Sequence, residues 1–210
     1  MRAGTQRLYE PIPWAGYPPS ARPDLANRYY AMRHGTSVAN EQGIINGDPE
    51  KGEEPTFGLT TRGRQEALKS AFLSQLPAET RIYASPFSRT RETAETVRHV
   101  IGASAVSIAG DLRERRFGQL EGKPVSSYEH VWFHDERNSA AEYMGVEPAK
   151  LVAVRGLRLI CQLEREHTDQ DILLVSHGDP LQILEATFKG MPAGDHRQLP
   201  ELRPAEIRRL

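Results

Sequence analysis

Short apolar runs alternate with longer segments of helical apolar spacing from residue 28 onward. This alternation is typical of strand–helix–strand units, in which each helix returns the chain so that successive strands lie parallel. The run at 171–175 is the most apolar, so we expect it at the centre of the sheet. Three further runs read as strands and the end of the chain is a candidate for a fifth: residues 29–32, 81–84, 105–109 and 205–210.

Three amphipathic helices are expected between the strands, at residues 61–76, 93–101 and 149–167. The first places Ala67, Leu68, Ala71 and Phe72 on one face. In the third, Leu151 and Cys161 lie on or near the apolar stripe, so we expect Cys161 to be core packing. Strands and helices together predict an α/β fold, a three-layer α/β/α sandwich with a mostly parallel central sheet.

Two segments depart from this alternation. Residues 1–27 contain five prolines, which favour extended backbone, and we interpret them as an arm. The arm either packs through its aromatic residues or is disordered. Residues 119–148 are polar and contain four aromatic residues, and we interpret them as a small cap inserted into a domain that spans residues 28–210.

Composition narrows the possible partners and compartments. Lys and Arg total 27 against 28 Asp and Glu, so we expect no binding to nucleic acid or anionic membranes. The single cysteine excludes an intramolecular disulfide, and no apolar stretch reaches the length of a signal peptide core or a membrane span, so we expect a cytoplasmic protein. His130 and His134 lack an acidic third ligand in register, so we expect no metal.

A polar cluster follows each of the four main strands. Because the carboxyl ends of parallel strands lie along one edge of a sheet, we expect the clusters to meet in a ligand-binding crevice. Two guanidinium groups, two imidazoles and one carboxylate suit a phosphate, since arginine forks match phosphate oxygens and imidazole can attack phosphorus as a neutral nucleophile. The clusters are Arg33-His34-Gly35-Thr36, Ser85-Pro86-Phe87-Ser88-Arg89, Leu112-Arg113-Glu114 and Ser176-His177-Gly178.

These four motifs, in this order over about residues 28–190, resemble the histidine phosphatase superfamily, also called phosphoglycerate mutase-like. The resemblance implies that His34 is the nucleophile that becomes phosphohistidine and that Glu114 is the proton donor. It also implies that Arg33, Arg89 and Asn40 bind phosphoryl oxygens. His177 would stabilise the transferring group, and the helix start at Gly178 would add substrate-binding donors. No metal or organic cofactor is then required.

Several of these residues have a second interpretation. Arg89 lies among exposed charges and could form a surface ion pair. Glu114 stands in a run of arginines that would lower its pKa, whereas a capped pocket would raise it. Tyr128, Trp132 and Phe133 either pack the cap or stack on a ligand ring. The acidic segment 49–58, longer than the family's usual link, is expected to rim the pocket mouth.

We therefore expect a metal-independent phosphatase that hydrolyses a phosphorylated small molecule through phosphohistidine. One alternative is a cofactor-dependent phosphoglycerate mutase-type phosphotransferase. Mutases of this superfamily carry a longer, basic insertion where this chain has the short segment 119–148. The other alternative is a non-catalytic module that binds a phosphorylated ligand, which His34 and Glu114 argue against because both catalytic residues are present.

Overall fold

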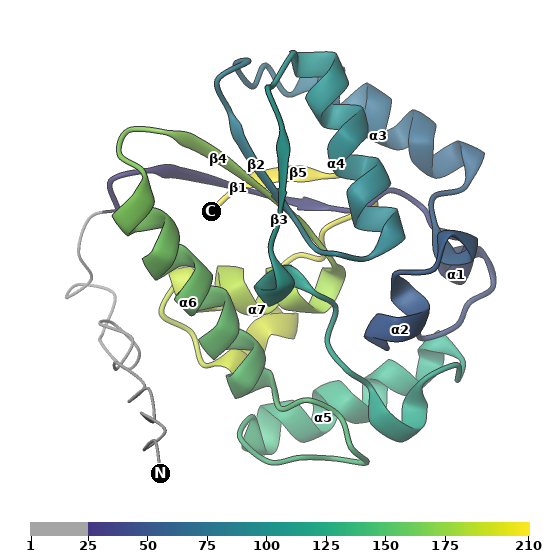
Figure 1. Ribbon diagram of the computed structural model, residues 1–210. Helices are drawn as coiled ribbons and strands as arrows, with labels where there is room; N and C mark the ends of the chain where they lie inside the picture. Colours follow the sequence, from purple (N-terminus) through teal and green to yellow (C-terminus); the bar gives the residue numbers. More distant parts are fainter. Residues whose placement is uncertain (1–24) are drawn as a thin grey trace, which may run out of the picture.

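The computed structural model describes residues 25–210 (Figure 1). Residues 1–24, which hold nearly all of the predicted arm, lie outside the described residues. At its edge, the Ala26 amide and the Asn27 side chain both donate to the Glu164 carboxylate, each at 2.7 Å. The start of the described chain is thereby attached to the domain.

Five strands form one sheet in the order β3-β2-β4-β1-β5. β1, β2, β3 and β4 all run parallel to one another, and β5 runs antiparallel to β1. β4 lies at the centre, as the sequence predicts, and all its residues after Asp171 are buried. The strands are β1 (Arg28–Arg33), β2 (Arg81–Ala84), β3 (Val106–Ile108), β4 (Asp171–Ser176) and β5 (Ile207–Arg209).

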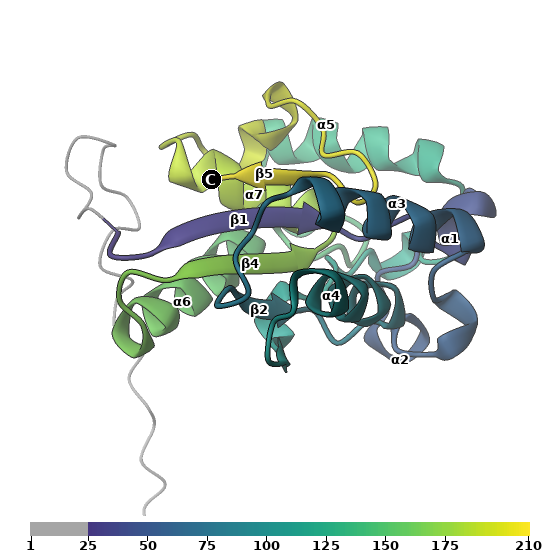
Figure 2. The same ribbon diagram turned by 90° about the horizontal axis from the view of Figure 1, so that it is seen from above.

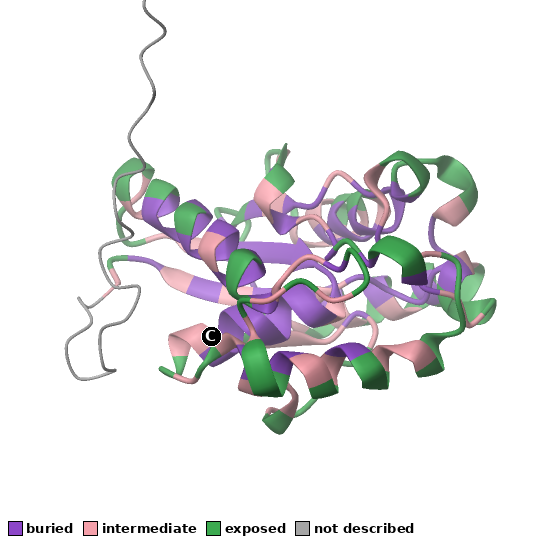
Figure 3. Ribbon diagram, turned by 90° about the horizontal axis from the view of Figure 1, so that it is seen from below, coloured by how far each residue is buried: buried purple, intermediate pink, exposed green. Residues whose placement is uncertain are grey.

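The helices form a layer on each face of the sheet, because alternate residues of β4 point to opposite sides. Leu173 and Val175 pack with α3 and α4, whereas Ile172 and Leu174 pack with α6 and α7. Buried residues accordingly run along the strands while the outer turns of the helices are exposed (Figure 3). The helices are α1 (Val38–Glu41), α2 (Pro49–Gly52), α3 (Thr61–Leu73), α4 (Ser88–Ile101), α5 (Tyr128–Asn138), α6 (Ala149–Glu166) and α7 (Gly178–Phe188).

The predicted α/β/α sandwich with a mostly parallel sheet is therefore confirmed. Seen from above, β1 and β4 point towards the end of the molecule where α1 and α2 lie (Figure 2). The loops that follow these strands meet at that end. No helix within residues 25–210 is long and apolar enough to cross a bilayer.

Some predicted details are wrong for identifiable reasons. α4 begins at Ser88, five residues before the predicted start, because its first turn is polar yet buried and so breaks the apolar pattern. The predicted strand at the chain end is shorter and antiparallel. Leu68 and Phe72 of α3 are exposed, since the buried residues of that helix are small, and Leu151 of α6 is exposed as well.

The small residues of α3 let the helix approach the loop after β1. A Cβ on Gly63 would clash with the backbone carbonyl of Thr36, and a Cβ on Gly35 would clash with the carbonyl of Gly63. Two glycines therefore bring α3 against the turn that begins at His34. Both positions require the absence of a side chain.

Residues 119–148 contain α5 and two of the 3₁₀ turns, η4 (Gly118–Leu120) and η5 (Val125–Ser127). They pack around a small apolar cluster of their own that includes Phe117, Val131 and Val146, with Ile45 contributed by the loop after α1. The remaining 3₁₀ turns are η2 (Pro55–Phe57), η3 (Gly110–Leu112) and η6 (Ala193–Gln198).

Candidate active site

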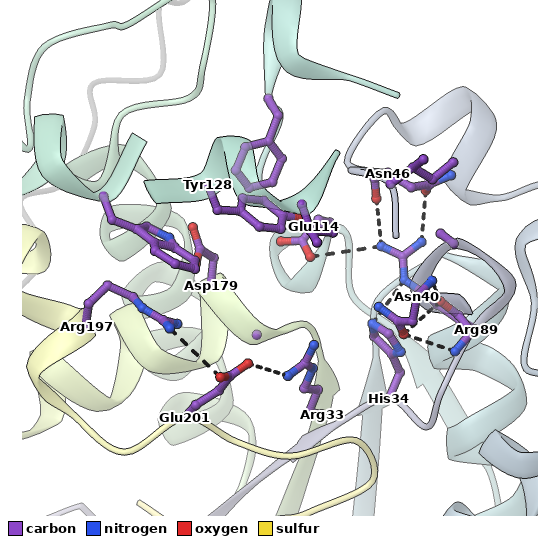
Figure 4. A pocket seen from close by; sticks show the side chains of 17 residues that line it. Arg33, His34, Asn40, Asn46, Arg89, Glu114, Tyr128, Asp179, Arg197 and Glu201 are labelled. Atoms are coloured by element: carbon purple, nitrogen blue, oxygen red, sulfur yellow. Dashed lines mark hydrogen bonds and ion pairs between the residues drawn. The ribbon is translucent and has the colours of Figure 1, made fainter. Parts of the chain in front are cut away.

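A cavity of about 350 Å³ opens at the carboxyl ends of the strands. Figure 4 shows the side chains that line it, drawn from segments far apart in the sequence. The sheet edge thus brings the predicted clusters together, and His177 lies directly behind the wall with its ring centroid 5.2 Å from that of His34. The predicted residues on the wall itself are Arg33, His34, Asn40, Arg89, Glu114 and Gly178.

His34 is buried and both of its ring nitrogens are engaged. Nδ1 donates to the Gly35 carbonyl at 2.7 Å, and Nε2 accepts from Arg89 Nε at 3.1 Å. Burial and, after it, the charges of Arg89 and Arg33 hold the pKa of His34 well below its usual range. The imidazole is therefore neutral, and its Nε2 lone pair accepts the Arg89 Nε–H.

Arg89 lies in the first turn of α4 and is buried, so the surface ion-pair interpretation is wrong. Its Nη1 donates to Asn46 Oδ1 at 2.9 Å and its Nη2 to the Asn46 carbonyl at 2.8 Å. Burial lowers the pKa of Arg89 to about 10, which leaves it a cation at neutral pH. Asn46, which the sequence patterns did not single out, fixes the plane of this guanidinium.

Glu114 is buried, and burial raises the pKa of its carboxyl to about 7. The arginines beside it in sequence do not neutralise it. Arg113 forms two 2.8 Å bonds to Glu147, and Arg115 binds Asp135. The closest cation is Arg89, whose Nη2 lies 4.0 Å from Glu114 Oε2. The alternative of a salt-bridged carboxylate with a lowered pKa is therefore wrong.

His177 is fully buried beneath Glu114 and Phe87. Its Nε2 lies 2.9 Å from Ser85 Oγ, a hydroxyl that also accepts the Phe87 amide. Its Nδ1 has no hydrogen-bond partner among residues 25–210 and lies 3.7 Å from Glu114 Oε2. If the Ser85 hydroxyl donates its hydrogen bond to Nε2, the proton of the imidazole is on Nδ1, which then faces Glu114 as a donor.

Arg33 and two unpredicted residues form the outer part of the cavity. Arg33 Nη1 donates to Glu201 Oε1 and to the Leu202 carbonyl, each at 2.8 Å. The other carboxylate oxygen of Glu201 lies 3.9 Å from Arg197 Nη2. Arg197 and Glu201 belong to the segment that leads to β5, where neither apolar periodicity nor a motif marks a site.

Asn40 and Gly178 complete the predicted set. The Oδ1 atom of Asn40 accepts from the Ser37 amide and hydroxyl, each at 3.0 Å, which leaves its Nδ2 donors for the cavity. Gly178 is the first residue of α7, so its backbone amide belongs to the unbonded first turn of that helix. Both residues can therefore donate to an anion.

Trp132 lines the cavity, and its ring is in contact with two neighbouring side chains. Tyr128 stacks on it at a centroid distance of 5.4 Å, and the Arg197 guanidinium lies over it at 3.8 Å. Its Nε1 donates to Asp179 Oδ1 at 3.0 Å. Phe133 lies outside this cavity and is exposed. The aromatic residues therefore pack rather than offer a stacking face for a ligand at Trp132.

The acidic segment 49–58 does not rim the cavity, so that expectation is wrong. Ser88 Oγ donates to the backbone carbonyls of Gly52 and Glu54, which ties the segment to the start of α4. Glu53 and Pro55 line a different surface pocket. The segment is therefore bound to the residue that directly precedes Arg89.

The acidic side chains of the cavity are held by neighbouring donors. Asp179 pairs with Arg115 at 3.2 Å and with Trp132, and Glu201 pairs with Arg33. The neighbouring His196 and Arg115 side chains keep the pKa of Asp179 well below its usual value despite its burial. Within residues 25–210 no group of three histidine, cysteine or acidic side chains is arranged to hold a metal ion.

Comparison with known proteins identifies the class that this fold and site define. The family model of the histidine phosphatase superfamily (branch 1) matches residues 29–210, and the chain belongs to that superfamily. It is also 30% identical over 192 residues to an Escherichia coli protein named "Probable phosphoglycerate mutase GpmB", covering 86% of this chain and 83% of that one. The resemblance seen in the four motifs is thereby confirmed.

Solved structures support the same fold. An α-ribazole phosphatase from Shigella flexneri is 27% identical, with a TM-score of 0.68 over 86% of this chain and 88% of its own. A mycobacterial glucosyl-3-phosphoglycerate phosphatase is 22% identical, with a TM-score of 0.73 over 87% and 91% of the two chains. Relatives of this fold thus include proteins named as phosphatases and as mutases.

Proposed function

We propose that this protein hydrolyses phosphomonoesters of small molecules through a phosphohistidine at His34, without a metal ion. The observation that carries the proposal is one cavity in which a neutral imidazole and a buried carboxyl with a pKa of about 7 flank the same arginine. The imidazole supplies a nucleophile and the carboxyl a proton, while Arg89 stabilises charge on the phosphoryl oxygens.

In the first step, His34 Nε2 attacks phosphorus and the bond between phosphorus and the leaving oxygen breaks. Glu114 gives its proton to that oxygen, so the leaving group departs as an alcohol. Arg33 and Arg89 hold the phosphoryl oxygens, and His177 Nδ1–H donates to them. The Gly35 carbonyl keeps the proton on Nδ1 of His34, which stabilises the positive charge that the ring acquires.

In the second step, water attacks the phosphohistidine and Glu114, now a carboxylate, takes a proton from it. The phosphorus–nitrogen bond breaks and its electron pair returns to His34 Nε2. Inorganic phosphate leaves, and both residues regain their starting protonation. A carboxyl pKa near neutrality suits a group that must both give and accept a proton.

The charges around the cavity favour hydrolysis over the mutase alternative. A mutase must retain a bisphosphorylated intermediate, which calls for surplus positive charge. Here three arginines face three acidic residues, and the wall residues from the cap are uncharged. The arginines are Arg33, Arg89 and Arg197, the acids are Glu114, Asp179 and Glu201, and the cap residues are Val125, Tyr128 and Trp132.

Phosphate release from p-nitrophenyl phosphate and a panel of metabolite phosphates, measured in EDTA, tests the proposal. We expect release to persist in EDTA and to fall on the order of 10³-fold or more in His34→Ala. His99→Ala, which removes an exposed histidine of α4, is the matched control and should retain full activity. Substantial turnover by His34→Ala would remove this residue from the mechanism.

A trapping experiment separates hydrolysis from the alternatives. Rapid quenching with radiolabelled substrate should leave a phosphoryl group on the wild-type protein and none on His34→Ala. Conversion of 3-phosphoglycerate to its isomer in the presence of bisphosphoglycerate, with no phosphate released, would instead establish a mutase. Ligand binding with no labelling and no release would establish a binding module.

A further inference from the structure

Arg197 is unusually well fixed for an arginine at a cavity mouth. Its guanidinium lies over Trp132, and its Nη1 donates to Gln182 Oε1. Trp132 is itself held by stacking with Tyr128 and by the hydrogen bond from its Nε1 to Asp179. The cation is therefore positioned in advance of any ligand, so little side-chain entropy is lost when it binds one.

The anion that faces this cation is held much less firmly. Glu201 reaches between Arg33 and Arg197 with one oxygen to each (Figure 4). Its side chain is 56% exposed, and no other side chain within residues 25–210 donates a hydrogen bond to it. The backbone stays in place because the next residue, Leu202, is fully buried. A movable carboxylate thus stands between two fixed guanidinium groups.

Among residues 25–210, Glu201 is the acid that forms an ion pair with Arg197, and Asp179 acts on Arg197 only through its charge. Asp179 forms an ion pair with Arg115 and accepts a hydrogen bond from Trp132, and Glu114 lies beside Arg89. A phosphoryl group at His34 would engage Arg33, which is the other partner of Glu201. Arg197 would then face the part of the substrate that leaves.

We propose that Arg197 recognises a carboxylate on the leaving group, and that Glu201 is an internal carboxylate that occupies this position until the substrate displaces it. This inference rests on the proposed function, because it places the phosphoryl group at His34. The group now in place is itself a carboxylate, so its charge and size fit the spacing. One guanidinium balances a carboxylate but not a second phosphoryl dianion.

Calorimetric binding of substrate-like phosphonates tests the inference without requiring turnover. The probes are phenylphosphonate, its three carboxyphenyl isomers and the benzenediphosphonates. We expect one carboxyphenyl isomer to bind the wild-type protein about tenfold more tightly than phenylphosphonate, and Arg197→Gln to abolish that preference, as for loss of a charged hydrogen bond. Glu201→Gln should raise the preference roughly twofold to fivefold, because it removes the competing ion pair.

Matched controls separate these effects from loss of charge or of folding. Arg203→Gln removes an exposed arginine of the same segment, and Glu142→Gln removes an exposed glutamate of the cap; neither lines the cavity. Both should keep the wild-type preference. Thermal unfolding of every variant checks that the fold is intact.

The inference would be overturned by no preference for any carboxyphenyl isomer, by equal weakening of all probes in Arg197→Gln, or by tighter binding of a diphosphonate. Equal weakening of all probes in Glu201→Gln would likewise show that Glu201 only orients Arg33. Phenyl phosphate hydrolysis measured in parallel keeps the two proposals apart. Hydrolysis without the preference overturns this inference alone, and the preference without hydrolysis overturns the proposed function alone.

Discussion

Burial sets the protonation of two residues in opposite directions. Burial lowers the pKa of the His34 imidazole and raises the pKa of the Glu114 carboxyl, because desolvation disfavours the charged form of each group. The nucleophile and the acid that we propose therefore arise from one physical cause. Asn46 and Ser85 then orient the groups around them through hydrogen bonds to Arg89 and His177.

Glu114→Gln should reveal the acid through its dependence on the leaving group. We expect kcat/KM for alkyl phosphates to fall by about 10²–10⁴, and much less for p-nitrophenyl phosphate, whose leaving group needs little protonation. In the wild-type protein, kcat/KM for an alkyl ester should also decline above about pH 7, where Glu114 loses its proton.

Rates measured from pH 5 to pH 9 on both esters provide the comparison. The decline above pH 7 should be absent from the alkyl-ester profile of the glutamine variant. Equal losses on the two esters, or a decline that persists in the variant, would rule out Glu114 as the general acid.

Residues beside strand ends were predictable, whereas residues that reach the cavity from irregular segments were not. His34, Glu114 and His177 follow apolar runs, so the topology of a parallel sheet alone places them together. Asn46 and Glu201 lie in loops whose path depends on long-range packing, and no local pattern encodes it. The direction of the Glu114 pKa shift could not be predicted from the sequence. Arg113 and Arg115 are its sequence neighbours, but their side chains bind other carboxylates in the structure.

At the level of elements, the site depends on how closely α3 approaches the end of β1. The predicted apolar face of α3 is half right: Ala67 and Ala71 are buried, whereas Leu68 and Phe72 are exposed, because small residues, including Gly63, make the contact. The early start of α4 has a similar origin, since its first turn is buried through hydrogen bonds by polar side chains such as Ser88. The spacing of apolar residues cannot predict either contact, because small or polar residues make both.

Gly63→Ala tests this close approach. Within a helix, such a change ordinarily stabilises by about 1 kcal/mol. Here we expect lower stability and lower activity, because the added Cβ displaces the Thr36 carbonyl and with it the turn that begins at His34.

Urea unfolding and phosphatase rates measure the two effects. Gly110→Ala is the control, because a Cβ at that position meets nothing within 4 Å. A Gly63→Ala protein as stable and as active as the wild type would show that the loop yields without consequence.

At the level of the whole molecule, a buried ion network joins α5 to α7. Arg115 lies between Asp135 of α5, at 2.6 Å, and Asp179 of α7, at 3.2 Å. Removing one partner of such a network leaves an uncompensated buried charge, so the cap and the floor of the cavity are coupled. The cavity wall is thereby part of the folded core.

Glu114 should reduce the stability of the folded protein at alkaline pH. Its pKa is about 7 in the folded state against an ordinary 4.5, so its penalty is absent below pH 4.5 and complete above pH 7. We expect Glu114→Gln to raise the free energy of unfolding at pH 8 by about 3 kcal/mol and to have little effect near pH 4.5.

Urea unfolding at the two pH values measures this difference, with Glu142→Gln as an exposed control. A glutamine variant less stable than the wild type at pH 8 would mean that the folded protein favours the ionised carboxyl, contrary to a role as proton donor.

The contacts of Tyr128 and Arg197 with the Trp132 indole have an optical consequence. The chain contains two tryptophans, Trp14 and Trp132, so a Trp14→Phe protein would emit from the cavity wall alone. A ligand carboxylate that replaces Glu201 beside Arg197 should change the electrostatic field around that single fluorophore. The protein thus carries its own spectroscopic reporter, and occupancy of the cavity can be followed in real time without a label.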